Sequence, residues 1–149
     1  MSERSAREAR SRSPGHRLVD HVADCVIEAR GPDPQTCISE ALIALVESVV
    51  RIREPQKTAT RQLPSVPCPV EDALVALLDE VIFSLEVRSE VPVRFRLLET
   101  ENGGFAGDMD VVPVASAELL GPVPKAASYH DLEVSNGARG WRCHVLVDL

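Results

Sequence analysis

The chain has 149 residues, of which 44% are hydrophobic and 26% charged, a balance typical of one soluble globular domain. Its net charge of −7 argues against an autonomous nucleic-acid binder, because neutralising phosphates requires lysine and arginine, and favours a cation or a basic partner surface. There is no apolar run of roughly 18 residues and no secretory signal, so we expect a cytoplasmic protein without a membrane span.

The first segment in chain order is predicted to be a disordered tail over residues 1–15, because it is rich in serine, arginine and glutamate and ends in Pro14-Gly15. Residues 1–13 carry a charge of +2, and the remainder carries −9. A short basic arm could touch RNA, although a solvated tail is the simpler interpretation. One folded domain is expected over residues 16–149.

The first expected elements are two strands, over residues 17–20 and 25–30. The segment His21-Val22-Ala23-Asp24 lies near their junction. Gly31-Pro32 is a typical stop signal and ends the second strand.

Two helices are predicted from apolar residues that recur at helical spacing. Asp33 is a good N-cap for the first helix, Pro34 suits its first position, and the apolar pattern continues to about residue 53. The second helix opens at Pro69, has acidic residues in its first turn, where the helix dipole favours them, and ends near residue 88.

Further strands are indicated by alternation of apolar and polar residues. Prolines break residues 54–68, where we expect only a short edge strand around residues 58–63. Residues 91–98 alternate, Asn102-Gly103-Gly104 is a strong turn signal, and residues 105–114 return. Because this glycine-rich turn leads into a strand and not into a helix, it predicts a hairpin and not a phosphate loop.

The C-terminal part predicts a last hairpin, with strands over residues 125–134 and 141–148 and a turn over residues 135–140. Two helices and an excess of hairpin-connected strands indicate an α+β fold. We expect two layers, with two helices packed on one face of a largely antiparallel sheet.

The four cysteines are scattered, with no Cys-x-x-Cys spacing, which argues against zinc and against a disulfide framework. Three of them lie in apolar-patterned segments, so we interpret them as small buried hydrophobes. They are Cys25, Cys37, Cys68 and Cys143.

Three short motifs, in this order and at these distances, resemble the archease family. They are the run His21-Val22-Ala23-Asp24, the run Lys125-Ala126-Ala127-Ser128-Tyr129-His130, and the strand that closes in Val147-Asp148. The resemblance covers about residues 16–149. Val22 departs from the family's usual threonine, whereas Ser128 keeps the hydroxyl of the family's threonine at that position.

The resemblance implies an accessory protein and not an enzyme. Archeases bind a divalent cation and activate the RtcB-type RNA ligase, which uses GTP and manganese to join RNA ends in tRNA splicing or RNA repair. Such a protein promotes guanylylation and multiple turnover of the ligase, and meets guanine nucleotide or RNA only through it. The family's metal ligands map onto Asp24, Asp148 and Leu149, and its motif lysine maps onto Lys125.

The residue chemistry is compatible with that assignment. Carboxylates lower the cost of dehydrating a hard cation, and oxygen ligands suit calcium, magnesium or manganese better than zinc. Leu149 could add a backbone carbonyl or a terminal carboxylate. The plainer interpretation is that Asp24 caps a turn and Asp148 is simply solvated.

Other side chains are weaker candidates. His21 and His130 could serve the site, although a histidine before a tight turn more often bonds backbone. Lys125, one of only two lysines, could contact a phosphate or could pair with a nearby acid. His16 and His144 are expected to be structural or solvated.

Two other classes of function stay open. The same aspartates could hold a water-activating metal in a phosphohydrolase, although no general base is evident. The apolar helices could bind unfolded chains in a chaperone-like module, although their apolar faces are typical of an ordinary core.

Overall fold

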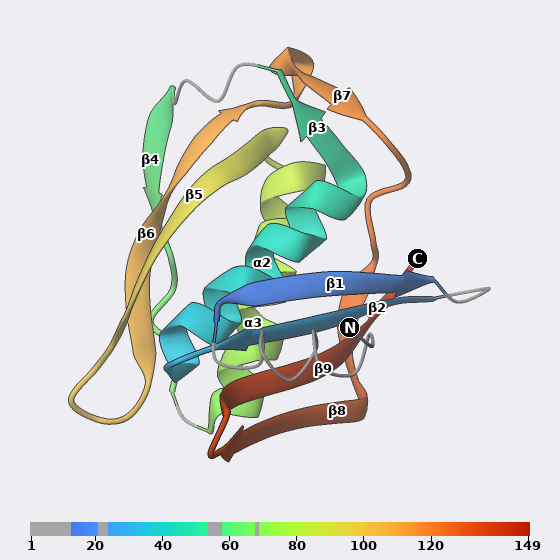
Figure 1. Ribbon diagram of the computed structural model, residues 1–149. Helices are drawn as coiled ribbons and strands as arrows, with labels where there is room; N and C mark the ends of the chain where they lie inside the picture. Colours follow the sequence, from blue (N-terminus) through green and yellow to red (C-terminus); the bar gives the residue numbers. More distant parts are fainter. Residues whose placement is uncertain (1–12, 21–23, 54–57, 68) are drawn as a thin grey trace.

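The computed structural model describes residues 13–20, 24–53, 58–67 and 69–149. It is an α+β fold in which every strand pair is antiparallel, as the sequence predicts (Figure 1). Most of the predicted tail, and the segment His21-Val22-Ala23, lie outside the described residues. Neither of the two described helices is long and apolar enough to cross a membrane.

The largest sheet has four strands in the order β1-β2-β9-β8. Its strands are β1 (Gly15–Asp20), β2 (Asp24–Gly31), β8 (Ala126–Gly137) and β9 (Gly140–Asp148). The predicted strand pairs are confirmed, but the expected six-residue turn is wrong. Ser135 and Asn136 continue the ladder until Gly137 pairs with Gly140, whose φ of 92° suits a tight two-residue turn.

A second sheet has the order β4-β6-β5. It contains β4 (Ala59–Gln62), β5 (Glu90–Glu99) and β6 (Phe105–Pro113). The short edge strand and the hairpin around the glycine-rich turn are therefore confirmed. Arg96 ties this sheet together from its exposed side, because it donates to Asp108 and, through two nitrogens, to the buried Asp110.

The helices are α2 (Pro34–Val49) and α3 (Val70–Glu86). Asp33 is confirmed as the N-cap of α2, since its side chain accepts from Thr36 N at 2.8 Å. The predicted end of α2 near residue 53 is wrong, because the backbone turns extended at Val50. Residues Val50–Ile52 form β3, which pairs with β7 (Ala117–Leu119) after the short 3-10 helix η1 (Val114–Ser116).

Both helices contact the four-stranded and the three-stranded sheets (Figure 1). Helix α2 packs on β1, β2 and β9 and also on β5, while α3 packs on β8 and β5. The strands therefore divide among three sheets, where one was expected. The reason is that adjacent residues of each helix, such as Leu77 and Leu78 of α3, are both fully buried, so each helix has a wide apolar surface to cover.

The three cysteines among the described residues are buried, as predicted; Cys68 lies outside the described residues. Cys37, in the first turn of α2, donates to the Ala29 carbonyl of β2 at 3.7 Å. Cys143 of β9 is the register partner of Ala29. A hydrogen bond with Cys143 and burial raise the pKa of the Cys37 thiol, which therefore stays neutral.

The edge strand β1 is anchored to α2 by one histidine. His16 Nδ1 lies 2.6 Å from Glu40 Oε2, and Nε2 lies 2.7 Å from Glu47 Oε2. Because both carboxylates accept, both ring nitrogens must donate, which requires the imidazolium. Burial lowers the pKa of His16, but the hydrogen bonds and charges of Glu40 and Glu47 more than offset it, so the pKa is raised.

The interaction of His16 with Glu40 and Glu47, called here the histidine clamp, predicts that the stability of the fold depends on pH. The folded-state pKa of His16 lies above its unfolded value of about 6.5. Its stabilisation is therefore fully present below pH 6.5 and is lost as pH rises through the raised pKa. We expect His16→Gln to lower the free energy of unfolding by about 1 kcal/mol at pH 5.5, and by less at pH 8.5.

Urea unfolding of both proteins across that range measures the effect. His130→Gln is the matched control, because the His130 side chain is 81% exposed, and it should show no such trend. An equal loss at both pH values would contradict a charged clamp.

Candidate functional site

Asp24 and Asp148 are direct register partners at one end of the β2–β9 ladder. Asp148 is also the partner of Ala126 on β8, and Lys125 N donates to the Asp148 carbonyl at 2.7 Å. The backbone thus brings three of the sequence-predicted positions to one end of the four-stranded sheet. The side chains of Lys125, Asp148 and Leu149 are exposed.

The alternation of side chains along β2 and β9 decides which residues lie on the outer face of the sheet, the face away from the helices. Ile27 and Val145 are register partners with no exposed surface, and Val147 is likewise fully buried. Since successive residues of a strand point to opposite faces, Asp148 belongs to the face away from the helices. The apolar pattern that builds the core therefore also sets the outward register of the β9 end.

Two aspartates of α3 hold the start of β8. Asp79 Oδ1 accepts from Ala127 N at 2.9 Å, and Asp72 Oδ1 accepts from the Tyr129 hydroxyl at 2.9 Å. The hydrogen bond to Asp72 is the largest cause of a raised pKa for Tyr129. Sequence reasoning treated Asp72 only as a helix-dipole residue and overlooked Asp79. Their spacing of seven residues, two turns on one helix face, was the available signal.

His130 is not brought to the Asp148 end. It lies in the irregular stretch of β8 between Ser128 and Glu133, and its Nε2 is 3.4 Å from Asp131. His21, the other weak candidate, lies outside the described residues. Among the described residues, which leave out the side chain of Asp24, no three histidine, cysteine, aspartate or glutamate side chains gather to hold a metal ion.

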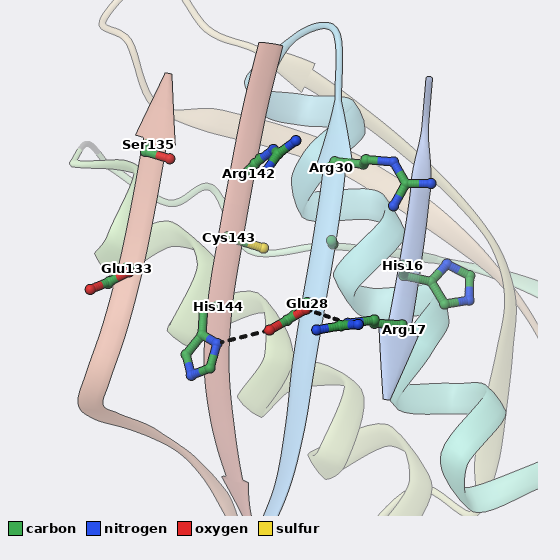
Figure 2. Close-up of a pocket in the computed structure, with 10 residues that line it drawn as sticks. His16, Arg17, Glu28, Arg30, Glu133, Ser135, Arg142, Cys143 and His144 are labelled. Carbon is green, nitrogen blue, oxygen red and sulfur yellow. Dashed lines mark hydrogen bonds and ion pairs between the residues drawn. The ribbon is translucent and has the colours of Figure 1, made fainter. Parts of the chain in front are cut away.

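The outer face of the same sheet carries an open groove of about 680 Å³ (Figure 2). Sequence reasoning did not predict it. In its central row, Arg17 donates to Glu28, and His144 Nδ1 lies 3.5 Å from the same carboxylate. The hydrogen bond from Arg17 is the largest cause of a lowered pKa for Glu28. The groove is lined by His16, Arg17, Glu28, Ala29, Arg30, Glu133, Ser135, Arg142, Cys143 and His144.

Comparisons with known proteins agree with this architecture. The model of the archease protein family (MTH1598/TM1083) matches residues 16–149. The chain is 37% identical over 137 residues to "Probable protein archease" of Mycobacterium tuberculosis H37Rv, which covers 92% of this chain and 76% of that protein. It is 25% identical to "Protein archease" of Methanosarcina barkeri, over 93% of this chain and 99% of that one. The chain therefore belongs to the archease family.

Solved structures show the same fold. The solution structure of Methanobacterium thermoautotrophicum protein 1598 has a TM-score of 0.65 at 18% identity, covering 91% of this chain and 99% of that one. The crystal structure titled "an archease, possible chaperone (TM1083)" from Thermotoga maritima has a TM-score of 0.63 at 19% identity, covering 89% and 96%. At these identities the likeness concerns the fold alone.

The Asp79 contact predicts a difference between two substitutions. Asp79→Ala leaves Ala127 N without its acceptor, so we expect a loss of about 1 kcal/mol in the free energy of unfolding. Asp79→Asn keeps a carbonyl oxygen at the same position and should lose less than half of that. Chemical denaturation measures both, and equal losses would show that charge, and not the hydrogen bond, fastens β8 to α3.

Proposed function

We propose that this protein is a cytoplasmic, metal-binding accessory protein that activates an RtcB-type RNA ligase in tRNA splicing or RNA repair. It promotes guanylylation of the ligase with GTP and allows multiple turnover, and it does not itself catalyse the joining. Family membership supports this proposal. One observation supports particular residues for this role. Asp24 lies opposite Asp148 in the strand register, and the backbone N–H of Lys125 donates a hydrogen bond to the Asp148 carbonyl.

The residues at this end of the sheet fit a hard divalent cation. Directly opposed residues of an antiparallel ladder share a face, so two carboxylate-bearing positions adjoin there. We assign Asp24, Asp148 and Leu149 as the ligands of calcium, magnesium or manganese, with oxygen donors throughout. A bound cation supplies a positive centre toward which phosphate oxygens of the ligase–nucleotide complex are drawn.

Lys125 is the proposed activating residue. It directly precedes β8, and its backbone is fixed by the bond to Asp148 while its side chain is exposed. An ammonium on a flexible stem suits a phosphate of GTP or of the ligase guanylate. Asp72 and Asp79 of α3 act as positioning residues, since they hold the β8 segment that follows Lys125.

The first test is a single-turnover guanylylation assay of an RtcB-type ligase in GTP and manganese, with and without this protein. We expect stimulation by the wild type and its loss, on the order of tenfold or more, in Asp24→Asn and Asp148→Asn. Asp131→Asn is the matched control, because Asp131 is exposed on the neighbouring β8 and asparagine tolerates its φ of 56°.

Three outcomes would overturn the proposal. An active ligase that the wild type does not stimulate removes the function. Turnover of phosphoesters by the protein alone in manganese would instead favour a metal-dependent phosphohydrolase. Suppression of aggregation of a model substrate, without any effect on the ligase, would favour the chaperone-like module.

A second test separates metal binding from activation. Titration calorimetry with manganese or calcium should show one site per chain, weakened at least tenfold by Asp148→Asn but not by Lys125→Gln. Lys125→Gln should nevertheless lose ligase stimulation. If Lys125→Gln stimulates normally, the lysine is a surface residue without a part in activation.

A further inference from the structure

The groove on the outer face of the four-stranded sheet contains two rows of opposite electrostatic character. In the central row, Arg17 and His144 each pair with Glu28, and the exposed Glu133 is the register partner of His144, so this row has two carboxylates. The next row contains Gly15, Arg30, Arg142 and Ser135, which are consecutive register partners across the sheet. That row has two guanidinium groups and no acidic position.

Arg30 and Arg142 are direct register partners, so two guanidinium-bearing positions adjoin on one face of the sheet. The chain is otherwise acidic, with 23 acidic and 16 basic residues. Within the described part of the chain, Arg142 forms no ion pair, and its side chain is exposed. Two adjoining guanidinium groups attract an oxyanion and can donate to it from both sides.

Gly15 leaves the space that Arg30 occupies. A Cβ at Gly15 would lie 2.6 Å from Arg30 Nη2 and 2.8 Å from its Cζ, so the guanidinium lies across β1 at that position. Figure 2 shows Arg30 extending toward β1 and Arg142 extending toward β2, both from the row that borders Glu28 and His144. Because residue 15 is a glycine, the guanidinium group of Arg30 can occupy the space beside it at the rim of the groove.

We propose that Arg30 and Arg142 bind a phosphate group carried by a mononucleotide or by a nucleic-acid strand. Each planar fork can donate to a separate oxygen of a phosphate, whether it is the doubly charged monoester of a mononucleotide or the singly charged diester of a strand. The described residues that line the groove include no phenylalanine, tyrosine or tryptophan, so they offer no platform for base stacking. Recognition is therefore of the phosphate and not of base sequence.

This site is separate from the proposed cation site. Arg30 and Arg142 lie six residues along β2 and β9 from Asp24 and Asp148, which is about 20 Å at about 3.4 Å per residue. One nucleotide cannot occupy both positions. The inference goes beyond ligase activation, and it is tested without any ligase, so either proposal can fail alone.

The experiment is fluorescence anisotropy of a labelled single-stranded RNA 12-mer at low salt, with the full chain and its variants. We expect Arg142→Gln and Arg30→Gln each to weaken binding on the order of tenfold, whatever the base sequence. Arg94→Gln, an exposed arginine on β5 in the other sheet, is the matched control and should bind as the wild type does. Thermal unfolding of every variant confirms that the fold is intact.

Two further measurements distinguish binding at these two arginines from non-specific electrostatic attraction. Neutralisation of one phosphate on a single strand predicts a slope of about −0.7 in log affinity against log salt. Gly15→Ala keeps both charges but displaces Arg30, so it should weaken binding by a smaller factor than Arg30→Gln. Equal losses in Arg94→Gln and Arg142→Gln, or unchanged binding in Gly15→Ala, would overturn the assignment.

Amide chemical shifts under titration with inorganic phosphate, GTP and succinate identify the source of the phosphate. Shifts at Arg30 and Arg142 with phosphate or GTP, absent in Arg142→Gln, support a mononucleotide. Binding of RNA alone, with the same arginine dependence, supports a strand. Succinate acting as strongly as phosphate, or no arginine-dependent binding of any probe, rejects a phosphate site.

Discussion

The pairing of β2 with β9 is the constraint on which the rest of the structure depends. It joins residues more than a hundred positions apart, and one register serves two purposes. The inward pairs, such as Ile27 with Val145, form part of the core beneath α2, while the same register sets Asp24 opposite Asp148 and Arg30 opposite Arg142. Because the side-chain period of a strand is two, a slip by one residue would turn carboxylates and guanidinium groups toward the helices and valines toward water. The core therefore fixes the arrangement of the functional face.

Much of this fold could be predicted from local signals. Alternation found the strands of both larger sheets, and the Asp33-Pro34 pair located the start of α2. The three-residue strands β3 and β7 were missed because so short a segment shows no period, and Val49 and Ile52 fit a helix equally well. The motif residues Asp24, Lys125 and Asp148 were found by resemblance. The Arg30–Arg142 row could not be found in that way, because only the strand register reveals which distant residues are neighbours.

The outer face of the sheet is electrostatically graded along β2 and β9. Aspartates occupy one end, a row of Arg17, Glu28, His144 and Glu133 lies in the middle, and an arginine pair occupies the other end. A polyanion meeting this face would be repelled at the aspartate end unless a cation were bound there, and attracted at the arginine end. The charge therefore changes from negative to positive along β2 and β9, and an anionic partner that binds this face has one preferred orientation.

The strand order also has a consequence for biosynthesis. β9 is the last strand in the chain, yet it lies between β2 and β8 in the sheet. A nascent chain that has emerged only as far as β8 has no partner for the inner edge of β2, and its hydrophobic underside stays open. The sheet can close only after residue 148 has left the ribosome, and closure requires the insertion of β9 between two strands that have already been made. Ribosome stalling shortly before that point would leave an aggregation-prone edge for chaperones to shield.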